Sequence, residues 1–139
     1  MPYQKGTVIK MELLGVWKLK KMISLGKGGF RMVDAAEIEK MEESPMKKEY
    51  QRMLEADFII SESSLEILYR PHEGEESLAA EKGWTVTGEG FVIERFPARI
   101  EDGVLMLDYK KDGTGYFPVF WDEEDCLSIS GGIMKIQKA

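Results

Sequence analysis

The stretch Leu13–Lys21, LLGVWKLKK, decides how the rest of this chain can be interpreted. Trp17 and Leu19 alternate with lysines, and a period of two is typical of a β-strand that buries one face. We therefore expect a first strand over residues 11–23, with its lysines directed away from the core.

The composition indicates a folded chain that forms a single domain over residues 1–139. Charged residues make up 32% of it and hydrophobic residues 43%, as in ordinary globular proteins. The formal net charge of −6 argues against nucleic acid as a partner, because phosphate contacts need a basic surface. Met1–Lys5 lacks the apolar segment of a signal peptide and no apolar run approaches about 18 residues, so we expect no membrane partner and a cytoplasmic location.

The residue types give little support for catalytic or metal chemistry. The single histidine, His72, follows a proline in a polar loop, and the single cysteine, Cys126, lies in a strand-like run. We expect a buried structural cysteine, no metal site, no cofactor and no enzyme activity. The glycines of Gly26–Gly29 do not have Walker spacing, so we interpret them as a flexible bend, with a mobile portal loop as the alternative.

Two short helices are expected after the first strand, over residues 34–43 and 45–56. Asp34 followed by Glu37 makes a capping box, and Ser44 precedes a proline at the first position of the second helix. The second helix is expected to bury a face formed by residues at helical spacing: Met46, Tyr50, Met53 and Leu54.

From Phe58 onward the apolar period changes to two. Residues 58–60 and 65–69 form a hairpin, and a brief helix near 75–82 ends at Gly83. The rest is an antiparallel meander whose apolar runs are separated by turn signals, Asp102-Gly103 among them.

The two aspartate–glycine turns set the expected registers of the meander. A two-residue turn at Asp102-Gly103 pairs Ile100 with Leu105, Ala98 with Leu107 and Phe96 with Tyr109. At Asp112-Gly113 a two-residue loop directs inward the set Tyr116, Pro118 and Phe120. A three-residue loop with a glycine bulge directs inward the set Phe117, Val119 and Trp121. We favour the second, which keeps proline off the core face.

These elements predict a mainly β protein. About eight to ten strands form an antiparallel, up-and-down, lipocalin-like β-barrel, with two short helices after the first strand and a third near 75–82. Closure of the barrel removes the exposed edges that a long open meander would present.

The segment Leu14–Leu19, LGVWKL, resembles the glycine-x-tryptophan first strand of the calycins, a group that comprises the lipocalins and the fatty-acid-binding proteins. The resemblance implies that Trp17 packs across the closed end of the barrel, with Gly15 leaving room. Lipocalins place an arginine of the last strand over this tryptophan, and Lys135 is the comparable residue here. The chain lacks the terminal arginine-x-tyrosine pair of fatty-acid-binding proteins, and Leu107 stands where the threonine of the lipocalin threonine-aspartate-tyrosine motif would be.

A barrel of this size holds one small ligand or is filled by side chains. We expect that the protein binds a small hydrophobic or amphipathic molecule without catalysing a reaction. The alternative is a protein-interaction or structural module whose barrel core is filled by side chains. The candidate lining residues share one predicted face: Leu19, Glu94, Phe96, Ile100, Leu105, Leu107, Tyr109, Phe117, Val119 and Trp121. Glu94 is either an internal polar anchor or the sign of a bulge, and Arg95 and Arg99 are candidates for an anionic head group.

Overall fold

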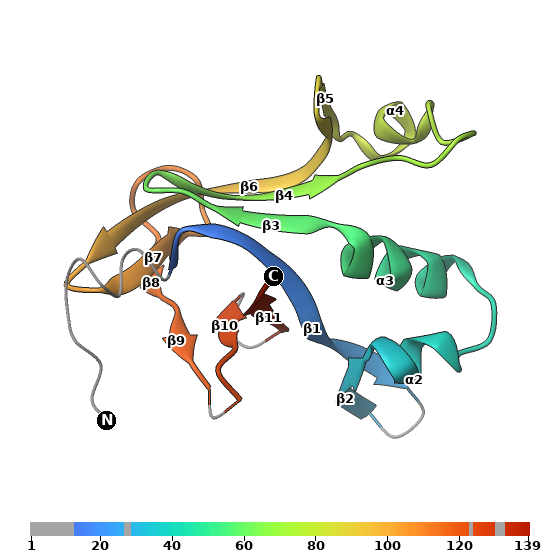
Figure 1. Cartoon of the computed structure of the whole chain (residues 1–139), viewed down its shortest axis with the longest axis horizontal. Helices are drawn as coiled ribbons and strands as arrows, with labels where there is room; N and C mark the ends of the chain where they lie inside the picture. The colour runs from blue at the N-terminus through green and yellow to red at the C-terminus, as the bar shows by residue number, and fades with distance from the viewer. Residues whose placement is uncertain (1–12, 27–28, 123, 130–132) are drawn as a thin grey trace.

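The computed structural model describes residues 13–26, 29–122, 124–129 and 133–139 (Figure 1). In this part of the chain, antiparallel strands form a nearly closed barrel accompanied by three short helices, which confirms the predicted fold class.

The elements follow one another along the chain as β1 (Gly15–Gly26), β2 (Gly29–Asp34), α2 (Ala35–Glu39), α3 (Pro45–Glu55), β3 (Asp57–Ile60), β4 (Ser64–Tyr69), α4 (Leu78–Lys82), β5 (Thr85–Thr87), β6 (Gly90–Glu101), β7 (Val104–Asp108), β8 (Tyr116–Pro118), β9 (Phe120–Trp121), β10 (Leu127–Ile129) and β11 (Met134–Lys138).

The barrel is a meander that closes through its own backbone. The hydrogen-bonded path runs β8-β7-β6-β4-β3-β1-β11-β10-β9, so the first and last strands of the path are β8 and β9. A single residue, Val119, separates these two strands, and its amide donates to the Leu105 carbonyl at 2.8 Å. The segment from β8 to β9 therefore pairs with β7 through its first half and with β10 through its second half.

The structure adds a strand that the sequence did not suggest. β2 pairs with the second half of β1, from Gly26 opposite Gly29 to Lys21 opposite Asp34. The sequence pattern predicts a bend at Gly26–Gly29 and a helix from residue 34, and it assigns no strand between them. The strand is hard to recognise because it buries Val33 fully while leaving Phe30 71% exposed. Residues 27 and 28, part of the predicted bend, lie outside the described residues.

The predicted helix signals are confirmed. Asp34 accepts a hydrogen bond from the Glu37 amide at 3.0 Å, and the Glu37 carboxylate accepts one from the Asp34 amide at 3.2 Å, so the capping box is complete. Ser44 caps α3 by accepting from the Lys47 amide at 3.1 Å. α4 ends at Gly83, which has a φ of 74°.

The buried face predicted for α3 is partly wrong. Met46 is 53% exposed, whereas its neighbour Lys47 is buried. The ammonium of Lys47 donates to the carbonyls of Glu39 and Met41, at 3.0 and 2.9 Å, and pairs with Glu43. Carbonyls left free where a helix ends need a donor, and this lysine supplies it for the end of α2.

The registers expected in the meander are confirmed where the structure pairs the strands. Ile100 lies opposite Leu105 and Ala98 opposite Leu107, across the Asp102-Gly103 turn. Leu107 lies opposite Phe117, which is the register that we favoured, but the connection spans residues 109–115 instead of three residues, and Phe117 is exposed instead of directed inward. Tyr109, expected opposite Phe96, lies after the end of β7.

The loop between β7 and β8 is organised by Asp108, which is fully buried. Its Oδ1 accepts from the amides of Lys110, Lys111 and Gly115 at 3.1 to 3.2 Å, and its Oδ2 accepts from the Gly113 amide. Four backbone donors on one carboxylate explain how a charged side chain is buried at this place without a cationic partner in the described contacts.

Candidate functional site

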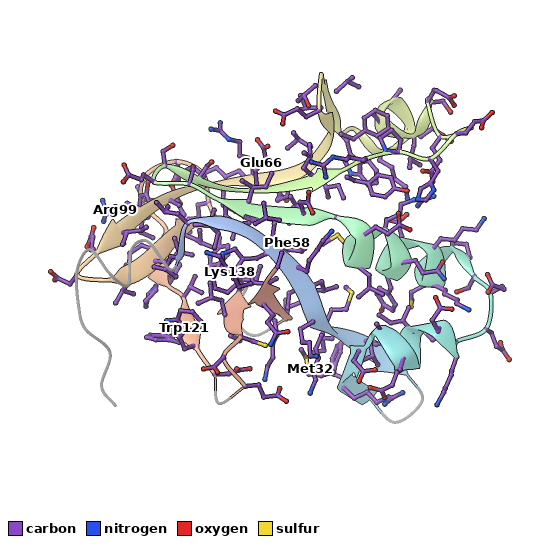
Figure 2. All side chains as sticks on the ribbon, in the orientation of Figure 1. Met32, Phe58, Glu66, Arg99, Trp121 and Lys138 are labelled. Carbon is purple, nitrogen blue, oxygen red and sulfur yellow. The ribbon has the colours of Figure 1, made fainter. Side chains whose placement is uncertain are left out.

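Most of the predicted lining residues meet inside the barrel. Leu19, Phe96, Leu105, Leu107 and Val119 are buried members of one cluster of side chains. Ile100, Tyr109 and Trp121 pack against the same cluster and are partly buried. The cluster also contains Phe58 and Ile60 of β3 and Leu65 and Ile67 of β4, so side chains fill much of the interior (Figure 2).

Two predicted lining residues, Phe117 and Glu94, do not belong to this cluster. Phe117 is 54% exposed and stacks on Tyr109 with ring centroids 6.3 Å apart. Glu94 is half-exposed and forms an ion pair with Lys111, whose Nζ lies 5.3 Å from the centroid of the Phe96 ring. The pairing of β4 with β6 shifts register between Ile67 and Leu68, so a bulge accompanies Glu94.

Trp17 lies near the start of β1 and is buried in the core cluster. This side chain is 1% exposed, its Nε1 donates to the Leu13 carbonyl at 2.9 Å, and its ring centroid lies 5.7 Å from that of Trp121. The buried indole therefore has both a polar partner and an aromatic neighbour.

The cation over this indole is Lys138, not Lys135. Lys138 is the cross-strand partner of Trp17, and its Nζ lies 5.3 Å from the ring centroid and donates to the Leu14 carbonyl. Lys135 instead pairs with Asp122 at 2.9 Å, which raises the pKa of the lysine. Lys138 is two residues from buried Ile136 and shares its face, so strand alternation in the sequence would have identified it.

Gly15 makes room for this lysine. Its φ of +124° is rare for residues with a side chain, and an added Cβ would lie 3.3 Å from Nζ of Lys138. Gly15, Trp17 and Lys138 thus form a single arrangement, which we call the closed end.

The other end is covered by α3 and is lined by flexible apolar side chains. Met22 of β1 lies opposite Met134 of β11, and both pack against the core cluster together with Met53 and Leu54 of α3. The Tyr50 hydroxyl of α3 lies 3.4 Å from the hydroxyl of buried Ser24 on β1, which fixes the helix across this end. We call this the helix-covered end.

Three hollows lined by described residues lie outside the barrel. One of about 460 Å³ separates α3 from α4, and a second of about 230 Å³ lies between α3 and the segment after β4. A third, of about 270 Å³, lies beside the turn between β3 and β4.

A polar cluster borders the second hollow. Burial, followed by its hydrogen bond to Glu75 at 2.7 Å, raises the pKa of Tyr69 well above its ordinary value. The hydrogen bond and charge of Glu55 raise the pKa of His72. Arg52 pairs with Glu75 at 3.5 Å, so the carboxylates here have cationic or hydroxyl partners.

Cys126 lies in a site that suits packing rather than nucleophilic attack. It is fully buried, and burial together with nearby Asp122 and Glu124 raises the pKa of its thiol. Within the described residues, no group of three or more histidine, cysteine, aspartate or glutamate side chains is placed to hold a metal ion.

Arg95 and Arg99, the candidates for binding an anionic head group, lie in different environments. Arg99 lies over the Tyr116 ring at 4.1 Å and pairs with Glu101. Arg95 approaches Glu66 at 3.7 Å and lines the third hollow.

None of the described helices is long and apolar enough to span a bilayer. No protein-family model, curated protein or solved structure matches this chain.

Proposed function

We propose that this protein is a non-catalytic binding barrel for a small hydrophobic or amphipathic molecule, which enters at the helix-covered end. The observation that carries the proposal is the contrast between the two ends of one apolar interior. Trp17 is buried at the closed end, whereas partly buried methionines of β1, α3 and β11 line the helix-covered end.

Methionine suits such an entrance because its unbranched thioether adapts to different shapes. Met22, Met53 and Met134 come from three separate elements, so a ligand that displaces them would need no change in the strand ladders. The predicted lining residues Phe96, Leu107 and Tyr109 belong to or pack against the same apolar cluster as these methionines.

Displacement of a fluorescent fatty-acid probe, 11-(dansylamino)undecanoic acid, tests the proposal. We expect saturable probe binding that oleate reverses. Met53→Trp would fill the helix-covered end and weaken binding at least about tenfold, the loss of roughly 1.4 kcal/mol. Met46→Trp is the matched control, because Met46 is exposed on the same helix. Absence of probe binding, or equal effects of the two variants in folded protein, would contradict the proposal.

The alternative is a filled barrel that acts as a protein-interaction module. Phe117 and Phe120 flank buried Val119 and are 54% and 65% exposed, so aromatic surface faces outward at the β8–β9 junction. Self-association that Phe120→Ser abolishes, measured by light scattering in a protein that does not bind the probe, would favour this function.

A further inference from the structure

The third hollow differs from the other two in the chemistry of its lining. Its residues are Ser63, Ser64, Arg95, Pro97 and Lys111, a set that includes two cations and two hydroxyls but no carboxylate. The first hollow contains Glu43 and Glu49, and the second contains Glu55 and Glu75. On a chain with a net charge of −6, a hollow lined only by donors and one proline is a distinct local environment.

The fold places the strand residues of the hollow, Arg95, Pro97 and Ser64, on the outer face of the barrel. Phe96 and Ala98 lie in the core, so the alternating residues Arg95 and Pro97 face outward. Ser64 is the cross-strand partner of Pro97. Figure 1 shows the loop after β7 arching beside the turn between β3 and β4, and this loop brings in Lys111.

The donors of the hollow differ in the partners that they already have. Arg95 forms an ion pair with Glu66, in which its Nε lies 3.7 Å from the carboxylate, and its side chain remains 62% exposed. The side-chain hydroxyl of Ser63 has no partner in the described part of the chain, whereas that of Ser64 lies 3.2 Å from the Ser61 hydroxyl.

Lys111 is held in place by its backbone. It has a φ of 62°, and its amide donates to the buried carboxylate of Asp108 at 3.1 Å. Its ammonium pairs with Glu94, which lies outside the hollow lining, and remains 45% exposed. An anion in the hollow would therefore meet a cation whose backbone is already fixed.

We propose that this outer hollow binds a phosphate group, either as the free ion or as part of a small monoester. The planar guanidinium of Arg95 matches two phosphate oxygens, Lys111 contributes charge, and the serine hydroxyls donate to the remaining oxygens. The volume of about 270 Å³ admits a phosphate group with a few further atoms. Lys111 also lies 5.3 Å from the Phe96 ring of the barrel core, but the phosphate site does not depend on the function proposed for the interior.

Titration with inorganic phosphate, followed by amide NMR against sodium chloride of equal ionic strength, tests the site. We expect saturable shifts confined to the amides of Ser63, Ser64 and Lys111 and the side chain of Arg95. Arg95→Gln should weaken binding at least about tenfold, because it removes the bidentate charged donor. Arg99→Gln is the matched control on the same strand, since Arg99 stacks on Tyr116 outside the hollow, and it should bind like the wild type.

Vesicles distinguish the source of the phosphate group. If the protein binds phosphate but not phosphatidylcholine vesicles containing phosphatidic acid, the ligand is a soluble phosphate compound. If it also binds these vesicles in a manner that Arg95→Gln abolishes, the ligand is a lipid head group. Absence of saturable shifts, or equal weakening by Arg95→Gln and Arg99→Gln, would overturn the proposal whatever the outcome of the fatty-acid experiment.

Discussion

Lys138 lies over the Trp17 indole and beside Gly15, so two regions far apart in the sequence form the closed end together. Each of these residues has a separate physical role. The indole fills space and donates to Leu13, the lysine covers the ring and donates to Leu14, and the glycine adopts a φ of +124° that admits the lysine.

Trp17→Ala should lower the free energy of unfolding by roughly 3–5 kcal/mol, because it removes a buried aromatic side chain and leaves a cavity. Urea denaturation of both proteins measures the difference. Trp17→Phe should cost less, since it keeps an aromatic ring and loses the hydrogen bond to Leu13. An alanine variant as stable as the wild type would show that Trp17 does not seal the barrel.

Lys138→Met should lower the free energy of unfolding by about 0.5–2 kcal/mol, because it removes a cation above an aromatic ring and a donor to a carbonyl. Gln137→Met, at the exposed neighbouring position, is the control and should be close to neutral. Equal stabilities of the two variants in urea denaturation would argue against a role for the ammonium.

At the scale of elements, two charged side chains add contacts between neighbouring segments. Lys47 of α3 caps the end of α2, and Asp57 at the start of β3 pairs with Lys18 of β1 and Arg70 after β4.

Lys47→Met should lower the free energy of unfolding by about 1–3 kcal/mol, because the carbonyls of Glu39 and Met41 lose a buried donor. Lys48→Met, which changes the exposed neighbour, should have little effect. The two variants are compared by thermal and urea denaturation. A greater loss in the Lys48 variant would refute the capping role.

Asp57 predicts a pH-dependent contribution to stability. Partial burial disfavours its charged form, but hydrogen bonds from Lys18 and Arg70 outweigh this and lower its pKa below the ordinary 3.8. Because the pKa is lower in the folded state, the stabilisation is fully present above the unfolded-state value and is lost as pH falls through the folded-state value. We therefore expect wild type to be more stable than Asp57→Asn at pH 7. This difference in the free energy of unfolding should disappear only in acid, as the pH falls through the carboxyl pKa values. Urea denaturation from pH 7 to pH 2 measures it. A pH-independent difference would contradict this account.

At the scale of the whole molecule, the strands differ in how many neighbours they have. β4 lies between β3 and β6, and all but one of its residues are buried. β5 pairs with β6 and is exposed along its whole length.

Hydrogen exchange should follow this difference. Amides of β4 are expected to exchange at least about 100-fold more slowly than those of β5, because opening β4 disrupts the barrel whereas β5 opens locally. Exchange followed by mass spectrometry or NMR gives both rates. Similar protection of the two strands would mean that β5 is integral to the barrel.

Local sequence signals determined much of this fold because their causes are local. The capping box at Asp34, the serine–proline start of α3, the glycine that ends α4 and the Asp102-Gly103 turn each depend on a few neighbouring residues. These turns set which residues of each strand face the core, and the resulting alternation of inward and outward side chains brings most of the predicted lining residues into one cluster.

Only the tertiary structure decided which residues meet across the barrel. The exposure of Phe117, the pairing of Glu94 with Lys111 and the donor-lined hollow depend on a bulge and on a loop arranged around Asp108. At the closed end the sequence indicated a buried tryptophan and an adjacent glycine, but the structure selected Lys138 as their partner. Closure of the meander, which sets the register of the last strand against the first, is the physical reason.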